Sequence, residues 1–173
     1  MIEAIKNRKS IRKFQNRKVE PEKIESILRA AMQAPSGMNG QPWEFVVVDD
    51  ADILEKMKEF SMGAHALKSA PMAIVVLKTK IIKRELMGAS FLSAQDLGAC
   101  TENLWLQSVE EGLGASWMGV APDSKSEAML SELLNLPNDV KAFAVLAIGY
   151  PAEDVDMATE MRYDENRVHY NKY

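Results

Sequence analysis

Residues 142–148 (AFAVLAI) are an apolar run that predicts a strand, and residues 70–77 (APMAIVVL) are apolar on both faces of an extended segment. Strands with this pattern lie inside a sheet whose two faces are both covered. Residues 44–48 are β-branched and aromatic, and residues 115–117 form a further short run, so each predicts another strand. The chain is therefore expected to fold as an α+β protein in which helices are layered on a sheet.

Helical patterns separate these strands. Residues 91–113 are apolar almost all round, which predicts a central buried helix, and their small residues would let another helix come close. Residues 78–90 are weakly patterned and predict a surface connection or a short helix. Residues 152–173 are polar but end in aromatic residues, which indicates an arm that docks elsewhere. Other helices are predicted from residue 2 to near 10, from 21 to before 35, from 49 or 50 to about 60, and from 124 or 126 to about 134.

Length and charge narrow the class of protein. A chain of 173 residues suits one domain, here 1–173, and needs neither disulfides nor a structural metal for its core. The 21 Lys and Arg residues against 25 Asp and Glu residues disfavour a nucleic-acid or anionic-membrane binder. Cys100 has no cysteine to pair with, and the N-terminus lacks a signal-peptide pattern. We therefore expect a cytoplasmic protein.

The sequence lacks the complete motifs of several common catalytic and nucleotide-binding sites. Trp117 stands where a Rossmann fingerprint starting at Gly112 needs its third glycine, and no Gly-Lys-Ser/Thr phosphate loop occurs. Met118 replaces the second glycine of a serine nucleophile elbow. His65 and His169 are far apart, so no metal site is expected. Cys100 lies in an apolar helix, where thiols are usually inert.

Two polar segments remain that could bind a ligand. Alternation along residues 8–14 (RKSIRKF) places Arg8, Ser10 and Arg12 on one side, where two guanidiniums and a hydroxyl could hold a phosphate. Taken alone, this segment is more simply a solvated basic face. Residues 34–43 combine prolines, glycines and uncharged polar side chains, which suits a flat polar heterocycle. The alternative is a turn anchored by a buried Trp43.

Two further segments are less distinctive by themselves. Residues 112–119 could be a helix cap, and the terminal arm with Arg162 and Arg167 could be a solvated tail. In combination, however, the chain resembles the nitroreductase family of flavoproteins, which bind FMN and use NADH or NADPH. The matching segments, in order, are RKSIRKF at 8–14, APSGMNGQPWEFVVV at 34–48, GLGASWMG at 112–119, AVLAIGYPAE at 144–153 and RYDENRVHYNKY at 162–173.

The resemblance assigns roles to individual residues. It implies that Arg8 contacts the FMN phosphate, that Ser10 lies near the ribityl chain and that Arg12 faces the N1/O2 edge, where a cation stabilises the charge of the reduced ring. Arg162 is the preferred second phosphate contact, with Arg167 in reserve. The complete set of expected cofactor contacts is Arg8, Lys9, Ser10, Arg12, Pro35, Ser36, Gly37, Asn39, Met118, Gly119, Arg162 and Arg167.

The same resemblance implies further features of the site and shows where this chain departs from the family. Residues 35–39 are expected to line the flavin bound mainly by the other subunit. Met118 and Gly119 match a backbone segment over the flavin, where an amide N–H can bond N5. The pyrimidine edge has only His65 and Lys68 as candidates. Lys9 replaces a residue that is often arginine or histidine in the family.

The implied fold is a mainly antiparallel sheet flanked by helices, in a homodimer intertwined through the 91–113 helix and exchanged arms. The implied function is ping-pong transfer: NAD(P)H delivers hydride to FMN, and a nitroaromatic, quinone or similar small-molecule acceptor is then reduced. No catalytic side chain is needed. The alternatives are a sibling chemistry such as dehalogenation or flavin breakdown, a non-catalytic flavin binder, and an interaction domain without a cofactor. Because the chain is shorter than the larger family members, the choice of substrate stays open.

Overall fold

The computed structural model describes residues 1–173, apart from the side chain of Arg84. Its centre is a four-stranded sheet in the order β1-β2-β4-β3. The strands are β1 (Trp43–Val48), β2 (Met72–Lys78), β3 (Gly114–Gly119) and β4 (Lys141–Gly149). Each neighbouring pair is antiparallel. The predicted α+β class with a mainly antiparallel sheet is therefore confirmed.

Residues 70–77 form a central strand, β2, as the sequence predicts, and the apolar run 142–148 forms the other central strand, β4. Val75 on β2 lies opposite Val145 on β4, and both are completely buried. Successive side chains of a strand point to opposite faces, so an internal strand needs apolar residues at every position. Val75 and Val145 belong to one apolar cluster, whereas Ile74 and Leu146 belong to another on the opposite face.

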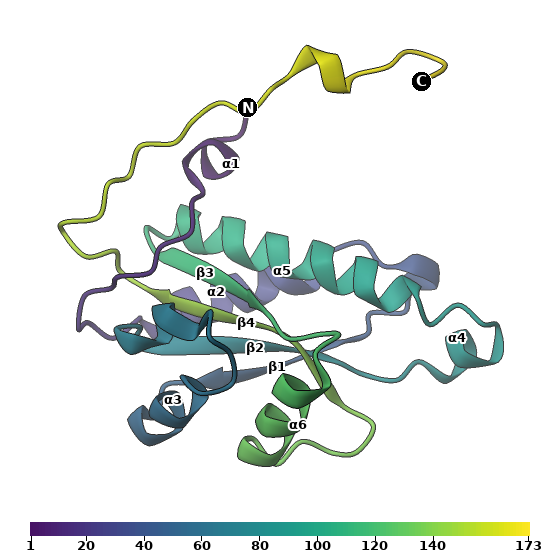
Figure 1. Cartoon of the computed structure of the whole chain (residues 1–173), viewed down its shortest axis with the longest axis horizontal. Helices are drawn as coiled ribbons and strands as arrows, with labels where there is room; N and C mark the ends of the chain where they lie inside the picture. Colours follow the sequence, from purple (N-terminus) through teal and green to yellow (C-terminus); the bar gives the residue numbers. More distant parts are fainter.

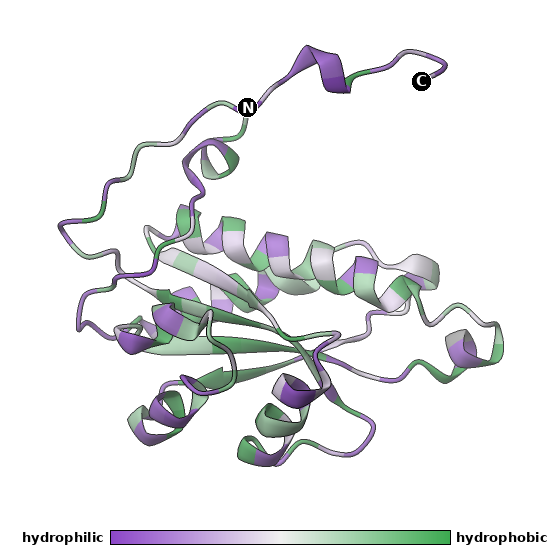
Figure 2. Ribbon diagram, in the orientation of Figure 1, coloured by the Kyte–Doolittle hydropathy of each residue, from purple (hydrophilic) through white to green (hydrophobic). Residues whose placement is uncertain are grey.

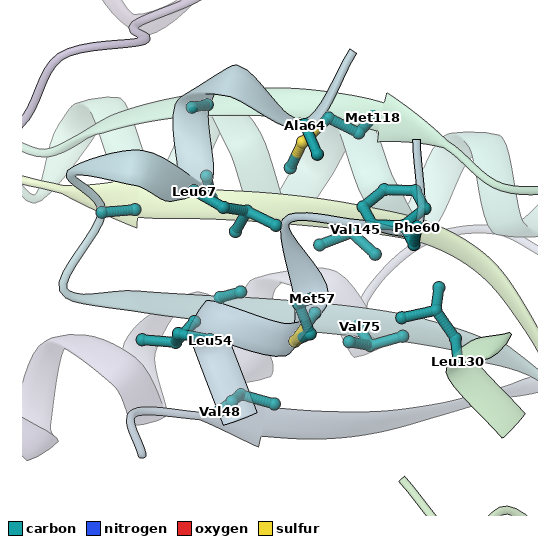
Figure 3. Packing of buried hydrophobic residues seen from close by; sticks show 14 of the residues in the cluster. Val48, Leu54, Met57, Phe60, Ala64, Leu67, Val75, Met118, Leu130 and Val145 are labelled. Carbon is teal, nitrogen blue, oxygen red and sulfur yellow. The ribbon is translucent and has the colours of Figure 1, made fainter. Parts of the chain in front are cut away.

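Different helices cover the two faces of the sheet (Figure 1). One face carries α2 (Pro21–Met32) and α5 (Leu92–Glu110), and the other carries α3 (Ala51–Met57) and α6 (Ser124–Leu133). Figure 3 shows the second face, where Met57, Phe60 and Leu130 pack over Val75 and Val145. The hydropathy colouring of Figure 2 shows β2 and β4 as continuous apolar segments, whereas β3 is paler.

Short-range capping sets the ends of several helices. Asp50, rather than Asp49, caps α3, because its carboxylate accepts the N–H groups of Asp52 and Ile53, each at 3.0 Å. Asp123 caps α6 in the same way, by accepting the N–H of Lys125 at 3.2 Å. A short helix, α4 (Ile82–Leu86), occurs within the predicted surface connection. Gly112, at φ 74°, adopts the left-handed conformation that ends a helix such as α5.

One expectation for α5 is wrong in the single chain. The helix was expected to be buried all round, but it packs on the sheet and α2 and leaves its remaining side open, with Ala94 and Gln95 exposed. A Cβ built on Gly98 would meet no atom within 4 Å. The apolar residues of α5 therefore exceed what this sheet and α2 can cover. Within the described residues, no helix has the length and apolar character needed to cross a membrane.

The two ends of the chain run together outside the sheet. The short helix α1 (Glu3–Asn7) rests on α5, and the following extended segment lies along β3, where Ile11 N–H donates to Ala115 O at 2.9 Å. Figure 1 shows the C-terminal arm passing this segment and then leaving the body. Thr159 Oγ1 donates to Lys6 O at 2.8 Å. The first half of the arm, up to Thr159, thus docks on the N-terminal segment, in agreement with the prediction of a docking arm. The second half is mostly exposed in the single chain.

Candidate functional site

The extended segment after α1 holds its cations on a rigid edge of the sheet. Ile11 is buried, and a Cβ on Gly114 would lie 2.5 Å from its side chain, so only glycine allows this close approach. The neighbours Ser10 and Arg12 are half-buried and exposed, respectively. Ile11 is thus the inward-facing residue between Ser10 and Arg12, but the predicted alternation does not continue, because Lys13 is exposed and Phe14 is buried.

Arg8 is held by two residues of α5. Its guanidinium carbon lies 4.4 Å from the ring centroid of Trp105, which is cation–π distance, and its Nε lies 4.0 Å from a carboxylate oxygen of Glu102. The side chain is 20% exposed. Arg8 is therefore oriented in advance, with part of its donor set still open to solvent.

Trp105 and Glu102 are site residues that the sequence argument missed. Both lie in α5, the helix that the sequence predicts from its apolar residues alone. Glu102 was the available signal, because an acidic residue in a mostly apolar helix needs an explanation. Its partner Arg8 could not be named from spacing, since 94 positions separate the two residues.

Lys9 faces the arm. Its ammonium donates to the backbone carbonyls of Asp156 and Ala158, each at 2.7 Å. These bonds hold the first half of the arm beside the N-terminal segment. A direct contact between the Lys9 side chain and FMN stays a prediction, and the structure gives this side chain a different role.

Arg162 and Arg8 line the same hollow of about 630 Å³, which lies between α1 and the arm. Lys6 and Lys9 also line it, so four cationic residues border this space, together with the acidic residues Asp156 and Glu160. Arg167 is not among its lining residues, and its Nε lies 3.3 Å from Asp164 within the arm. Of the two predicted arginines of the arm, Arg162 therefore lies beside Arg8, and a phosphate contact of either one stays a prediction.

The outer edge of β3 presents Gly119. Because Ala115 accepts from Ile11, the odd-numbered residues of this regular antiparallel strand direct their backbone groups away from β4. The N–H of Gly119 therefore points to the outer edge, and a Cβ there would meet no atom within 4 Å. Met118 has the opposite direction: its backbone faces Val145, and its side chain packs in the core. Of the two predicted residues, Gly119 can offer its N–H to a ligand.

The loop of residues 35–41 lies elsewhere on α5. Gly37 N–H donates to Asp96 Oδ1 at 2.9 Å, near the start of the helix, whereas Arg8 meets the helix at Glu102 and Trp105. Six residues separate Asp96 from Glu102, which is about 9 Å along a helix axis. Pro35 and Asn39 are exposed, and Ser36 and Gly37 are half-buried. The chain thus presents its two predicted flavin-binding segments at separate positions along α5.

His65 and Lys68 lie on the short 3-10 helix η2 (Ala64–Lys68), and both side chains are exposed. The residue after this helix is tied to the N-terminal segment, because Phe14 N–H donates to Ser69 Oγ at 3.1 Å. Lys68, Phe14 and Asn16 line a second hollow there. Of the two candidates for the pyrimidine edge, Lys68 therefore lies near the end of the Arg8–Phe14 segment.

Thiol and metal chemistry are the remaining possibilities among the described residues. Cys100 is completely buried, and burial raises the pKa of its thiol to about 12, so it is an inert apolar residue. In the described part of the chain, no group of three His, Cys, Asp or Glu side chains is placed to hold a metal ion. The chemistry available here is that of cations, uncharged polar groups and backbone N–H groups.

Known proteins with similar sequence and structure share this architecture. A protein of Clostridium acetobutylicum, provisionally assigned as an NADH oxidase, is 44% identical, with a TM-score of 0.90 over 98% of this chain and 99% of that one. An FMN-dependent nitroreductase of Clostridium difficile is 31% identical, with a TM-score of 0.88 over the full length of both chains.

Relatives identified by sequence point the same way. A protein of Archaeoglobus fulgidus, provisionally named an NADH dehydrogenase/NAD(P)H nitroreductase, is 36% identical over 99% of this chain and 98% of its own length. An iodotyrosine deiodinase of Thermotoga neapolitana is more distant, at 26% identity over 97% of this chain and 95% of its own length. The sequence profile of the nitroreductase family matches residues 5–65 and 61–150. With a matching profile over most of its length and this sheet order, the chain belongs to the nitroreductase family.

Proposed function

We propose that this protein is an FMN-dependent oxidoreductase that takes electrons from NADH or NADPH. The observation that carries the proposal is the convergence of Arg8 and Arg162 on one hollow. The segment that follows Arg8 pairs with β3, whose outer edge presents the N–H of Gly119. FMN needs a cationic pocket for its phosphate and neutral donors for its ring, and the described residues fit both needs.

Arg8 and Arg162 would bind the phosphate. Guanidinium groups form charge-assisted and often bidentate hydrogen bonds to phosphate oxygens. Trp105 and Glu102 orient Arg8 before the ligand arrives, which lowers the entropy that binding must cost. Ser10, two residues along the chain from Arg8, would donate to the ribityl chain.

Gly119 and Arg12 would hold the ring. When bound, FMN supplies a ring that accepts a hydride from NADH or NADPH and passes two electrons to an acceptor. The outward N–H of Gly119 suits N5, and the Arg12 guanidinium stabilises the negative charge that the reduced ring carries at N1. The protein then needs no acid or base of its own, since protons can come from solvent or a ribityl hydroxyl. Its residues position the reactants and exclude water.

The site would be completed by a second copy of the chain in a homodimer. The loop of residues 35–41 and the Arg8 segment are separated along α5, one side of α5 is open, and the ends of the chain expose apolar side chains. Ile2 and Phe91 are 69% and 66% exposed, and Tyr170 is 84% exposed. A two-fold partner would cover these groups and bring its own Ser36 and Asn39 to the flavin.

The acceptor is proposed to be a nitroaromatic or a quinone. Reductive removal of iodide from iodotyrosine is the second candidate, because a deiodinase occurs among the relatives that match nearly the whole chain. The two reactions leave different products, a reduced acceptor in one case and free iodide in the other, so one assay series separates them.

The first experiment is the visible spectrum of the purified protein before and after anaerobic NADH or NADPH. We expect a yellow protein whose bound flavin is bleached and is then reoxidised, over many cycles, by a nitroaromatic or a quinone. A single bleaching with no reoxidation by any acceptor would indicate a flavin binder without turnover. A colourless protein that fails to take up added FMN would refute the proposal.

A further inference from the structure

The loop of residues 35–41 has an unusual backbone. Met38, Asn39 and Gln41 have φ values of 55°, 50° and 46°, and none of them is glycine. Residues other than glycine rarely adopt this left-handed backbone conformation, and they keep it only where surrounding contacts impose it. Three such residues within four positions therefore require external restraints.

Some of the restraints lie within the loop itself. Gln41 N–H donates to Ser36 Oγ at 3.1 Å, and Gln41 Nε2 donates to Asn39 Oδ1 at 2.9 Å. These bonds close the turn but do not fix its position on the protein. Gly37 supplies the link to the body, because its N–H donates to Asp96 Oδ1 at 2.9 Å and its backbone lies against Leu92.

Asp96 is well suited to hold this loop in place. It lies in α5, a helix anchored on the sheet and on α2, and it is only 5% exposed. A buried carboxylate is costly unless hydrogen bonds compensate its desolvation, and a bond from a backbone N–H to a carboxylate is stronger than one between neutral groups. The carboxylate thus restrains the residue between Ser36 and the left-handed turn.

We propose that Asp96 is a positioning residue that holds the 35–41 loop in its flavin-binding conformation. This inference rests on the proposed function, in which Ser36 and Asn39 reach the flavin of the other subunit. Asp96 then acts on a flavin bound mainly by its partner, whereas Glu102 and Trp105 of the same helix act on the flavin bound through their own Arg8. One helix would position parts of both sites.

The test compares Asp96→Ala and Asp96→Asn with Thr101→Val. Thr101 is a matched control, because it is a completely buried polar residue of α5 whose hydroxyl donates to Leu97 O within the helix. In the flavin-free protein, hydrogen exchange of residues 36–41 should be about tenfold faster in Asp96→Ala. Asp96→Asn keeps an acceptor oxygen and should restore most of the protection, and Thr101→Val should match the unmodified protein.

Flavin binding gives the second readout. Asp96→Ala should bind FMN about tenfold more weakly and shift the visible absorption bands of the bound flavin, with recovery in Asp96→Asn and no change in Thr101→Val. If Asp96→Ala does not fold, Asp96→Ser replaces it, since a serine hydroxyl is too short to reach Gly37. Unchanged exchange in the loop would overturn the inference, as would a loosened loop with unchanged FMN affinity and spectrum.

A mixed dimer tests whether Asp96 acts on the partner's site. Chains carrying Asp96→Ala and Arg8→Ala, each with a different affinity tag, are co-expressed and the hybrid is isolated. One site then combines an intact Arg8 with an intact loop, so we expect one tightly bound FMN per hybrid dimer. No tight site would mean that Asp96 and Arg8 serve the same flavin from one chain. If the unmodified protein binds no FMN, the proposed function fails, while hydrogen exchange still tests the contact between Asp96 and the loop.

Discussion

The central sheet and the two chain ends are built in opposite ways. β2 and β4 are held by long ladders and bury almost every side chain, whereas the ends rest on few contacts and expose much of their apolar surface. The expected flavin-binding cations, however, lie on the ends: Arg8 and Arg12 precede the first long helix, and Arg162 lies in the arm. The sheet therefore supplies the frame, and the chain ends, which rest on few contacts, supply the charge.

This difference has a functional consequence. Local opening costs least where few apolar contacts and exposed hydrogen bonds hold a segment, and ligand-binding segments are commonly of this kind. Residues 8–14 are an intermediate case, because Ile11 and Phe14 are buried and tie them to the sheet. We therefore expect changes in the sheet to act on folding and changes in the ends to act on the cofactor.

The largest expected effect comes from breaking the sheet. Leu146→Ala removes a completely buried side chain from β4 and should lower the free energy of unfolding by about 2–5 kcal/mol, because it leaves a cavity between the sheet and its helices. Urea denaturation followed by circular dichroism measures it. Leu86→Ala, at an 84% exposed position, is the control and should change stability by less than about 0.5 kcal/mol. Equal losses of stability in Leu146→Ala and Leu86→Ala would show that the sheet does not dominate the stability of the fold.

The next effect concerns the chain ends. Arg8→Ala should weaken FMN binding by about 10- to 150-fold, the range expected for losing a charge-assisted hydrogen bond, with little change in stability. Fluorescence titration with FMN gives the affinity. Arg167→Ala should bind FMN normally, because this residue lies outside the hollow. A loss in Arg167→Ala and none in Arg162→Ala would reverse the assignment of the second phosphate ligand.

A smaller effect is expected at the exposed Arg12. Removal of its charge in Arg12→Ala should make the bound flavin harder to reduce, by about 30 mV, which is a tenfold change for a two-electron couple. An anaerobic redox titration against indicator dyes measures the potential. Lys13→Ala is the control, because the ammonium of Lys13 is paired with Asp154 at 2.7 Å. A potential unchanged by Arg12→Ala would remove Arg12 from the N1 edge.

The smallest effect lies where the sheet meets the N-terminal connection. Tyr150 donates to Glu20 at 2.6 Å, and chiefly this bond lowers the pKa of Glu20 to about 2. A carboxylate with a lowered pKa in the folded state stabilises the fold above its unfolded pKa, near 4.5, and loses this contribution as pH falls towards 2. Tyr150→Phe should therefore destabilise the protein slightly at pH 6, and the difference should shrink between pH 5 and pH 2.

Urea midpoints of the two proteins across this pH range provide the measurement. Tyr170→Phe, in the exposed arm, should match the unmodified protein at every pH. Tyr150→Phe keeps the ring and removes only the hydroxyl. A stability difference that stayed constant from pH 6 to pH 2 would therefore show that the hydroxyl does not act through its bond to the ionised carboxylate of Glu20.

Much of the fold could be predicted from the sequence because its signals are local. The uninterrupted apolar pattern of residues 70–77 identifies an internal strand by itself, and the prolines and glycines of residues 35–42 identify a loop. The α5 prediction failed in part for the opposite reason. An apolar circumference indicates that a helix must be covered, but it does not state whether the cover comes from the same chain.

The sequence by itself determined the elements, their order and the residue types of the expected site, since strand and helix periodicity, turns and caps depend on neighbouring residues. Only the tertiary structure decided that Arg8 rests on Trp105, that Lys9 holds the arm, that Gly119 rather than Met118 offers its N–H, and that Asp96 holds Gly37. These contacts join positions far apart in the chain. They depend on how whole layers pack, and no local pattern encodes that.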